Sequence, residues 1–350
     1  MIRYNVPTLG KEEERAAVRV LRSHWVAEGK EVERFENELC RFLGAQSGHA
    51  AALSSGSAAL YVALKVLGVG LGHEVVAPSY ACSAILDAIF LAGAVPVLVD
   101  IGEDDLNISA AQAKRRVNGR TKAVIATHTY GVPADMRELS KLGVPIVEDA
   151  AQAIGAKYAG KPAGVSGDIA VFSFGATKML TSGNGGMVFS QKKELVERVK
   201  EFRAYEEPRG HKQRFNFQLS DLQAAIGRVQ LKKLPGFLRK RKSIARRYLA
   251  AFPKELVWPG KFEDRETNWY RFLVRSQNPS RLQKEFRRVG VDTRIPRESF
   301  DPLHRRLKLN WNEFPVSERT GKTMLSLPLY PSLKESEVAR IIQAGRRYIQ

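Results

Sequence analysis

Lys178 is the residue of this sequence whose surroundings most suggest chemistry. It is the one charged residue in the stretch SFGATKMLTSGNGGMVFS, which runs from Ser173 to Ser190 and otherwise contains small, polar and apolar residues. A lysine with little competing charge around it loses its proton more easily than an exposed lysine. The neutral amine can then condense with an aldehyde to form a Schiff base. A structural or exposed lysine is the alternative, so this residue does not define a site by itself.

A second group of interest is the turn Ser55-Gly56-Ser57, where a short apolar strand is expected to end and a helix to begin. The free N–H groups at a helix start, together with the helix dipole, suit a phosphate group. The hydroxyl of Ser57 can add a further donor. The same three residues can also be an ordinary helix cap, so the turn alone is a weak signal.

Asp149 is the third candidate, because it follows the apolar segment PIVE and precedes AAQA. A carboxylate just beyond a buried strand requires a cationic partner or several hydrogen-bond donors. It can hold a proton on the ring nitrogen of a ligand, or it can cap the next helix. Pyridoxal 5'-phosphate (PLP) has an aldehyde, a phosphate and a ring nitrogen that must stay protonated. Lys178, the turn and Asp149 together match these three demands.

The elements that must position these residues alternate between strand and helix. Short runs rich in Val and Ile predict strands covered on both faces, and their alternation with helices predicts an α/β domain with a mostly parallel sheet. After about residue 250 the pattern changes to that of a smaller α+β domain. We expect a large domain over residues 1–235 and a small C-terminal domain over 236–350, with the first ~30 residues able to pack against the small domain. The expected strands begin near residue 51 and continue over 74–80, 95–101, 122–131, 144–152, 168–174 and 185–190.

The carboxyl ends of these strands carry the polar side chains. In open α/β sheets, ligands bind at that edge. The residues expected there are Ser55, Gly56, Ser57, Tyr80, Cys82, His128, Tyr130, Asp149, Gln152, Ser173 and Lys178.

The bulk composition is that of a soluble globular protein, with 44% hydrophobic and 27% charged residues in a chain of 350. No apolar run reaches the roughly 18 residues that a membrane span requires, and the start of the chain lacks a signal-peptide pattern. Two cysteines cannot form a disulfide framework. We therefore expect a cytoplasmic protein that does not associate with a membrane, and no metal is part of this expectation.

The formal net charge of +19 attracts anions. Residues 228–254 contain ten Lys or Arg residues and no Asp or Glu, in a segment that reads as a helix with one basic face. Such a segment can be a solvated helix face, an attractor of a phosphorylated small molecule, or a nucleic-acid contact surface. No nucleic-acid motif accompanies it, so we do not expect nucleic acid to be a partner.

Nearly the whole sequence resembles the PLP-dependent sugar aminotransferases of the DegT/StrS group, in the fold type I superfamily of aspartate aminotransferase. The segments that carry the resemblance include SSGSAALYVALKVLGVG, THTYGVPADM, FNFQLSDLQAAIGRVQLKKL and LSLPLYPSL, and the most specific is Glu148–Val188. The resemblance implies a PLP transferase fold with helices on both faces of the sheet. It also implies a homodimer whose active sites lie at the interface.

The resemblance also assigns roles to individual residues. Lys178 would form the Schiff base and Asp149 would pair with the pyridinium nitrogen, with Gln152 near the ring hydroxyl. The residues that would bind the phosphate are Gly56, Ser57 and Ser173, and Asn216 would reach the phosphate of the partner's cofactor. The implied reaction moves an amino group from an amino acid, usually glutamate, to a keto sugar that is typically nucleotide-linked, as in amino sugar biosynthesis.

Several positions depart from the family pattern. Cys82 stands where an aromatic residue usually stacks on the cofactor, with Tyr80 two residues away. Asn184 stands where glutamate is common, Gln218 for arginine, Ile154 for histidine and Gly175 for a larger residue, and the usual histidine of the small domain is not evident near Asn268. These changes leave open a PLP-dependent lyase or dehydratase and a catalytically weak regulatory homologue. Relatives that dehydrate carry histidine at the lysine position, so Lys178 favours transamination.

Overall fold

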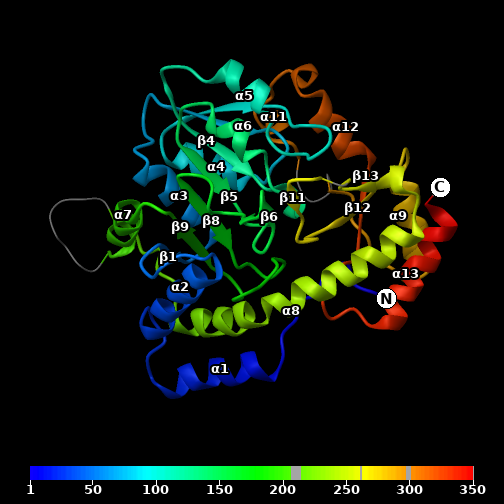
Figure 1. Ribbon diagram of the computed structural model, residues 1–350, viewed down its shortest axis with the longest axis horizontal. Coiled ribbons are helices and arrows are strands. Elements are labelled where there is room, and N and C mark those ends of the chain that lie inside the picture. Colours follow the sequence, from blue (N-terminus) through cyan, green and yellow to red (C-terminus); the bar gives the residue numbers. More distant parts are fainter. Residues whose placement is uncertain (206–213, 261, 297–300, 350) are drawn as a thin grey trace.

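A seven-stranded sheet forms the centre of the larger region in the computed structural model, which describes residues 1–205, 214–260, 262–296 and 301–349 (Figure 1). The strand order is β1-β9-β8-β5-β4-β2-β3. Strand β9 is antiparallel to both of its neighbours and the other pairs are parallel, so the predicted mostly parallel sheet is confirmed. The strands are β1 (Ala50–Leu53), β2 (Glu74–Pro78), β3 (Val95–Val99), β4 (Thr121–Thr127), β5 (Ile146–Asp149), β8 (Ile169–Ser173) and β9 (Gly186–Phe189).

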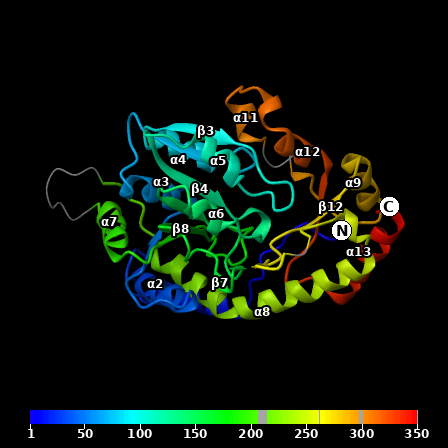
Figure 2. The ribbon, with the colours of Figure 1, turned by 45° about the horizontal axis from the view of Figure 1, so that its top comes forward.

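Helices cover both faces of this sheet, as the α/β pattern predicts (Figure 2). One face packs against α3 (Gly56–Val66), α4 (Ala84–Leu91) and α7 (Lys193–Arg203). The other face packs against α2 (Lys30–Phe42), α5 (Ala110–Arg116), α6 (Met136–Ser140) and α8 (Asp221–Ala251). Burial on both sides explains why the strands are continuous apolar runs rather than alternating ones.

The strands end earlier than the sequence predicts. The expected strand 122–131 ends at Thr127, because Thr129–Gly131 form a 3-10 turn, η1. Within it, Gly131 has a φ of 88°, and a Cβ there would lie 1.8 Å from Oδ1 of Asn268. Glycine at this position therefore lets the edge of the large sheet approach the smaller region closely.

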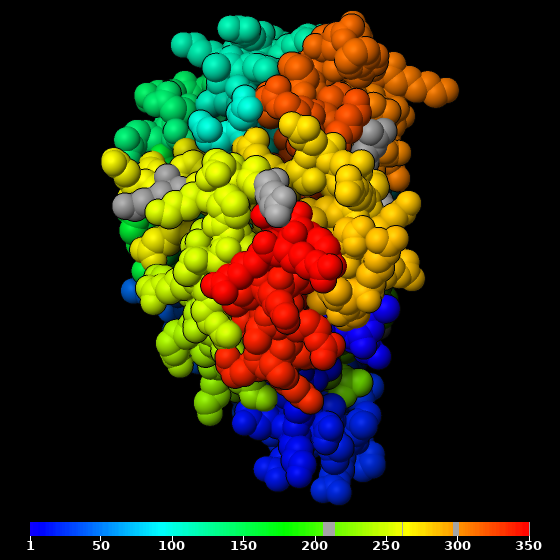
Figure 3. All heavy atoms as spheres, turned by 90° about the vertical axis from the view of Figure 1, so that its right-hand side faces the viewer, coloured from blue at the N-terminus to red at the C-terminus, as the bar shows by residue number. Residues whose placement is uncertain are grey.

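The smaller region has its own three-stranded sheet, in the order β10-β12-β13. Figure 3 shows its outer face, where α13 lies between the second half of α8 and α9. The elements are η2 (Lys254–Leu256), β10 (Val257–Trp258), β12 (Phe272–Arg275), α9 (Pro279–Arg288), β13 (Met324–Leu327) and α13 (Glu335–Tyr348). A third small sheet joins β11 (Arg265–Glu266) to β6 (Lys157–Tyr158) and β7 (Lys161–Pro162).

Helix α8 connects the two regions without a break. It passes through the expected boundary at residues 235 and 236, with Pro235 inside the helix. Its first half packs against α1 (Lys11–Arg22) and α2, and its second half packs against α13 (Figure 1). The division into domains stays a prediction. Any motion between the two regions would have to bend α8 or move it together with one of them.

Two segments cross between the regions. At the start of the chain, Ile2 pairs with Val291, and the hydroxyl of Tyr4 donates to Oγ of Ser326 over 2.9 Å. Later, α11 (Leu303–Arg306), η3 (Trp311–Glu313) and α12 (Pro315–Thr323) fold back onto the large sheet. No helix among the described residues is long and apolar enough to cross a bilayer.

Candidate active site

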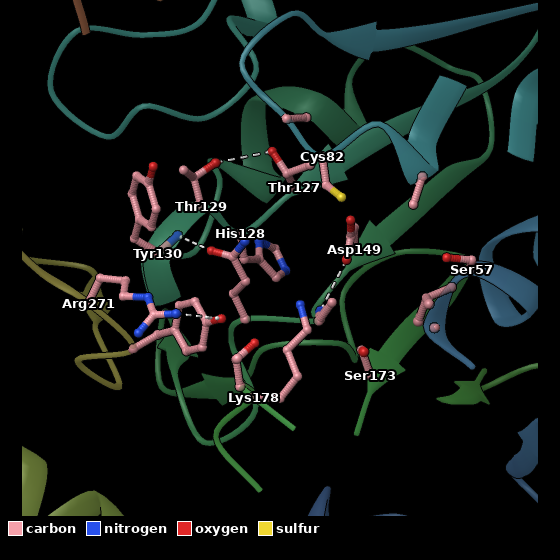
Figure 4. A pocket seen from close by; sticks show the side chains of 18 of the residues that line it. Ser57, Cys82, Thr127, His128, Thr129, Tyr130, Asp149, Ser173, Lys178 and Arg271 are labelled. Carbon is pink, nitrogen blue, oxygen red and sulfur yellow. Dashed lines mark hydrogen bonds between the residues drawn. The ribbon is translucent and has the colours of Figure 1, made fainter. Parts of the chain in front are cut away.

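A cavity of about 450 Å³ lies at the carboxyl ends of the parallel strands (Figure 4). Eight of the nine residues predicted to bind the cofactor line it: Gly56, Ser57, Tyr80, Cys82, Asp149, Gln152, Ser173 and Lys178. The ninth, Asn216, is exposed and does not line this cavity. The fold therefore brings the eight residues together, while the role of each stays a prediction.

The start of helix α3 forms one wall of the cavity. Ser55 caps the helix, and its Oγ accepts the N–H of Ala58 over 3.1 Å. Within the described residues, no hydrogen bond uses the N–H groups of Gly56 and Ser57. A Cβ at Gly56 would lie 2.7 Å from Cβ of Ser173, so glycine here allows the serine to sit directly against the turn. Two free N–H groups and two hydroxyls therefore face a common space that suits a phosphate.

Asp149 ends strand β5, and its Oδ1 accepts the N–H of Ala151 over 3.1 Å. Burial raises the pKa of the Asp149 carboxyl above its ordinary value, although the nearby Lys178 charge and the Ala151 N–H act in the opposite direction. The carboxylate thus lacks sufficient cationic compensation in the protein alone. A protonated ring nitrogen placed against it would supply that compensation.

The neighbouring Glu148 anchors the strand that carries Asp149. It accepts hydrogen bonds from the backbone N–H groups of Gly164 (2.8 Å), Ser166 (2.6 Å) and Gly167, and from Nε2 of His128 (2.8 Å). Burial opposes ionisation of Glu148, but these donors outweigh it and hold its pKa below the ordinary value.

His128 has a fixed tautomer in this arrangement. Its Nδ1 accepts the N–H of Ala134 over 3.0 Å, so the ring proton must be on Nε2, which faces Glu148. The ends of strands β4 and β5 are therefore tied together by the carboxylate of Glu148 and by His128, which itself lines the cavity.

Lys178 lies in the turn after strand β8, with its backbone N–H donating to the carbonyl of Gly175 over 3.0 Å. The side chain is partly buried and points into the cavity, on the same side as Asp149 and Ser173 (Figure 4). Its Nζ lies 6.0 Å from the ring centroid of Tyr270. A cofactor whose phosphate contacts Ser57 and whose ring contacts Asp149 would therefore have this amine within the same cavity.

The residues that depart from the family pattern divide into two groups, those that line the cavity and those that do not. Cys82 and Asn184 line the cavity, so they can change what it binds. Gln218 does not line it, and neither does Ile154, which is buried in the core. A Cβ at Gly175 would have its nearest neighbour at 3.9 Å, so the backbone there does not require glycine.

Asn268 joins the smaller region to the cavity wall. Its side-chain amide donates to the carbonyl groups of Gln152 (2.9 Å) and Ile154 (3.0 Å), and its Oδ1 accepts the N–H of Tyr270. This buried amide holds the residues before strand β12 against the segment that follows Asp149.

The lining residues that were not predicted include four large polar or charged ones: Tyr4, Tyr270, Arg271 and Arg294. They come from the first residues of the chain and from the smaller region. The sequence offered one signal, which is a basic residue at position 271 in the otherwise largely apolar segment WYRFLVRS. In the described part of the chain, no group of three or more His, Cys, Asp or Glu side chains is placed to hold a metal ion.

Five of the ten basic side chains in residues 228–254 interact with other groups in the described part of this chain. Arg228 forms ion pairs with Glu31 and Glu38, and Lys233 forms them with Glu12 and Glu13. Lys240 and Arg247 both bind Glu335, and the buried Arg241 donates to backbone carbonyl groups. Half of these cations are therefore engaged with groups of the same chain, which weakens the nucleic-acid alternative.

Comparison with known proteins gives one consistent result. The model of the DegT/DnrJ/EryC1/StrS aminotransferase family matches residues 7–346. The spore coat polysaccharide biosynthesis protein SpsC of Bacillus subtilis (strain 168) is 32% identical, over 99% of this chain and 97% of that protein.

Solved structures agree with this match. The aminotransferase TlmJ from Streptoalloteichus hindustanus is 31% identical with a TM-score of 0.91, over 99% of this chain and 98% of that one. DesV of S. venezuelae, solved in complex with a ketimine intermediate, is 32% identical with a TM-score of 0.91, over 99% of both chains.

Proposed function

The chain belongs to the DegT/DnrJ/EryC1/StrS aminotransferase family, which depends on PLP, and we propose how its own residues transfer an amino group. We propose that it moves an amino group from an amino acid, glutamate, to a keto sugar that is nucleotide-linked. Lys178 is the residue that holds the cofactor as a Schiff base. A relative that acts in spore coat polysaccharide biosynthesis supports a sugar acceptor.

The residues of the cavity fit PLP at three points. The free N–H groups of Gly56 and Ser57 and the hydroxyl of Ser173 suit its phosphate. The nearby charge of Lys178 does not offset the burial that raises the pKa of Asp149, and a protonated ring nitrogen would add the missing compensation. The partly buried amine of Lys178 suits its aldehyde. This meeting of three complementary groups in one cavity is the observation that carries the proposal.

When bound, PLP supplies an aldehyde that accepts the amino group and a ring that spreads negative charge. The protein's own groups do the rest. Asp149 keeps a proton on the ring nitrogen, and Glu148 and His128 hold the strand ends that position Asp149. Nζ of Lys178 moves a proton to and from the reacting carbon, as a general base and then a general acid.

The experiment compares the purified wild type with Lys178→Ala after addition of PLP. The wild type is expected to show the long-wavelength absorbance band of a lysine-bound cofactor, and Lys178→Ala is expected to lack it. Lys161→Ala, which removes an exposed lysine in β7, serves as the matched control and should keep the band. Equal bands in all three proteins would remove Lys178 from this role.

Adding glutamate to the loaded wild type then tests the reaction. Transamination is expected to replace this band with that of the pyridoxamine form. A lyase or a catalytically weak homologue is not expected to accumulate the pyridoxamine form. The measurement needs no knowledge of the acceptor. It therefore separates the aminotransferase from the alternatives that the departures at Cys82, Asn184 and Gln218 leave open.

A further inference from the structure

The cavity carries more positive charge than its expected cofactor chemistry uses. Among the described residues that line it, Lys178, Arg271 and Arg294 are cationic side chains, whereas Asp149 is the one carboxylate. Figure 4 shows Arg271 on the opposite side of Lys178 from Ser57 and Ser173. Arg271 is thus placed away from the residues that suit the phosphate of PLP.

The guanidinium of Arg271 is held by aromatic rings rather than by a carboxylate. Its central carbon lies 4.6 Å from the ring centroid of Tyr4 and 4.5 Å from that of Tyr270. One N–H group makes a long hydrogen bond of 3.4 Å to the Tyr270 hydroxyl, and within the described residues no ion pair involves Arg271. Stacking uses the faces of a guanidinium and leaves the N–H groups at its edges available for an oxyanion.

Arg294 also lines the cavity and lies near the same Tyr4 ring. Its guanidinium carbon lies 5.9 Å from the Tyr4 ring centroid, and it forms an ion pair with Asp292 at 3.4 Å. The N–H and carbonyl of Arg294 pair with Ser326, whose hydroxyl accepts from Tyr4. The first residues of the chain and the smaller region therefore hold both arginines in place.

The surroundings of this part of the cavity favour negative charge. The buried Arg241 lies behind it and donates to the carbonyl groups of Trp269, Tyr270 and Leu329, with no carboxylate among these acceptors. Burial opposes ionisation of the Tyr270 phenol, yet the charges of Arg271 and Lys178 lower its pKa to about 8. A buried phenol is stabilised as an anion here, so a stronger acid bound at the same place would be stabilised as well.

We propose that Arg271, assisted by Arg294, forms a second oxyanion subsite that binds a carboxylate or phosphoryl group of a reactant. The proposal rests on the proposed function, because it assumes that the cofactor's own phosphate lies against Gly56, Ser57 and Ser173. Both Nζ of Lys178 and the guanidinium of Arg271 lie against the Tyr270 ring, at 6.0 and 4.5 Å from its centroid. An oxyanion on Arg271 therefore belongs to a molecule whose reacting group can face the amine.

Two sources could supply this oxyanion, namely the carboxylate of the amino donor and a phosphoryl group of the acceptor. The test uses the PLP-loaded enzyme and two unreactive probes, glutarate and inorganic phosphate, with dissociation constants measured by titration calorimetry. Arg271→Gln removes the positive charge and the paired N–H donors of the guanidinium. Arg275→Gln removes the same charge from the far end of strand β12, outside this cavity, and serves as the matched control.

We expect Arg271→Gln to weaken at least one probe by about tenfold or more, and Arg275→Gln to bind as the wild type does. Loss of glutarate binding assigns the subsite to the donor, and loss of phosphate binding assigns it to the acceptor. Unchanged affinity for both probes in Arg271→Gln, or no binding of either probe to the wild type, overturns the proposal.

Two further variants separate a loss of binding from a loss of folding. Arg271→Lys retains the charge without the fork and should show intermediate affinity, and Arg294→Gln repeats the test if Arg271→Gln does not keep the melting temperature of the wild type. The outcome is separable from the proposed function. If glutamate fails to convert the wild type but glutarate still binds through Arg271, the reaction is wrong and the subsite stands.

Discussion

At the scale of single residues, we expect the charge of Asp149 to depend on the cofactor. Burial raises the pKa of its carboxyl, so the ionised form destabilises the cofactor-free protein. This cost is complete above the folded-state pKa and vanishes below the unfolded-state value of about 3.9. The cofactor would turn the same carboxylate into a favourable partner.

Asp149→Asn should therefore have opposite effects on the empty and the loaded protein. We expect the cofactor-free variant to melt about 2 °C higher than the wild type near neutral pH, with the gain shrinking as the pH is lowered towards about 4. We expect its affinity for PLP to fall by about tenfold or more. Melting curves against pH and a PLP titration measure the two effects, and a lower melting temperature at neutral pH would contradict the first.

Tyr270 gives a second prediction at this scale. Burial opposes its ionisation, but the charges of Arg271 and Lys178 outweigh that effect and lower its pKa to about 8. In the cofactor-free protein, tyrosinate absorbance should develop near pH 8 in the wild type and be missing in Tyr270→Phe. Because the folded pKa lies below the unfolded value of about 10, the stabilisation is complete above pH 10 and is lost as the pH falls through 8.

Tyr130→Phe is the control for this titration. Burial raises the pKa of the Tyr130 phenol well above its ordinary value, so its removal should leave the step near pH 8 in place. Arg271→Gln should move the step to higher pH. A step that survives in Tyr270→Phe would show that another tyrosine titrates there.

At the scale of elements, Asp100 fastens α12 to the end of strand β3. The fully buried carboxylate accepts the backbone N–H groups of Val316 (2.7 Å) and Ser317 (2.9 Å) and the hydroxyl of Ser317 (2.5 Å). Nearby, Ser79, at the end of β2, contacts Nδ1 of His304, and Nε2 of that ring contacts Glu318. The segment 303–323 therefore braces the strand ends that carry Tyr80 and Cys82.

Removal of this carboxylate should loosen the segment. We expect Asp100→Ala to destabilise the protein by about 2–3 kcal/mol, since it leaves buried N–H groups without an acceptor. Asp104→Ala removes an exposed carboxylate from the loop that follows and should change stability by less than about 0.5 kcal/mol. Urea unfolding, with limited proteolysis within residues 303–323, measures both, and equal stability of the two variants would contradict the role of Asp100.

At the scale of the whole molecule, the position of Asn216 bears on the assembly. The residue is exposed and does not line the cavity of its own chain, although the family pattern assigns it to cofactor binding. A homodimer in which Asn216 reaches the partner's site reconciles these two statements. The dimer stays a proposal, and it makes a prediction that a monomer would not satisfy.

Mixing two defective variants tests that assembly. Asn216→Ala and Lys178→Ala should each retain PLP poorly, and dimers that contain one copy of each should recover one intact site. We expect the mixture to regain the lysine-bound absorbance band in part after the subunits exchange, at a mass of about twice the 39.0 kDa chain by light scattering. A mixture that never exceeds the average of its components would exclude shared sites.

The sequence by itself determined the sheet and the residues at its edge. Local residue patterns indicate which segments are strands and which are helices, and their alternation predicts a parallel sheet. Parallel strands place their carboxyl ends at one edge of the sheet. From this the positions of Lys178, Asp149 and Ser57 at one edge followed, and the cavity confirms that they lie together. The boundaries were less accurate, because the strand ends at Thr127 and a 3-10 turn over Thr129–Gly131 follows it within the segment that was expected to be strand.

Only the tertiary structure decided which distant segments complete the cavity and how the two regions are joined. Tyr4, Tyr270 and Arg271 meet because the start of the chain lies along the small sheet, and no local pattern encodes such a contact. Helix α8 runs through Pro235 as the helical pattern of residues 228–254 indicates, but only the structure shows that its first half packs against α1 and α2 and its second half against α13. The physical reason is the same in both cases: local periodicity reports which face of an element is buried, whereas the partner that buries it is chosen by the packing of the whole chain.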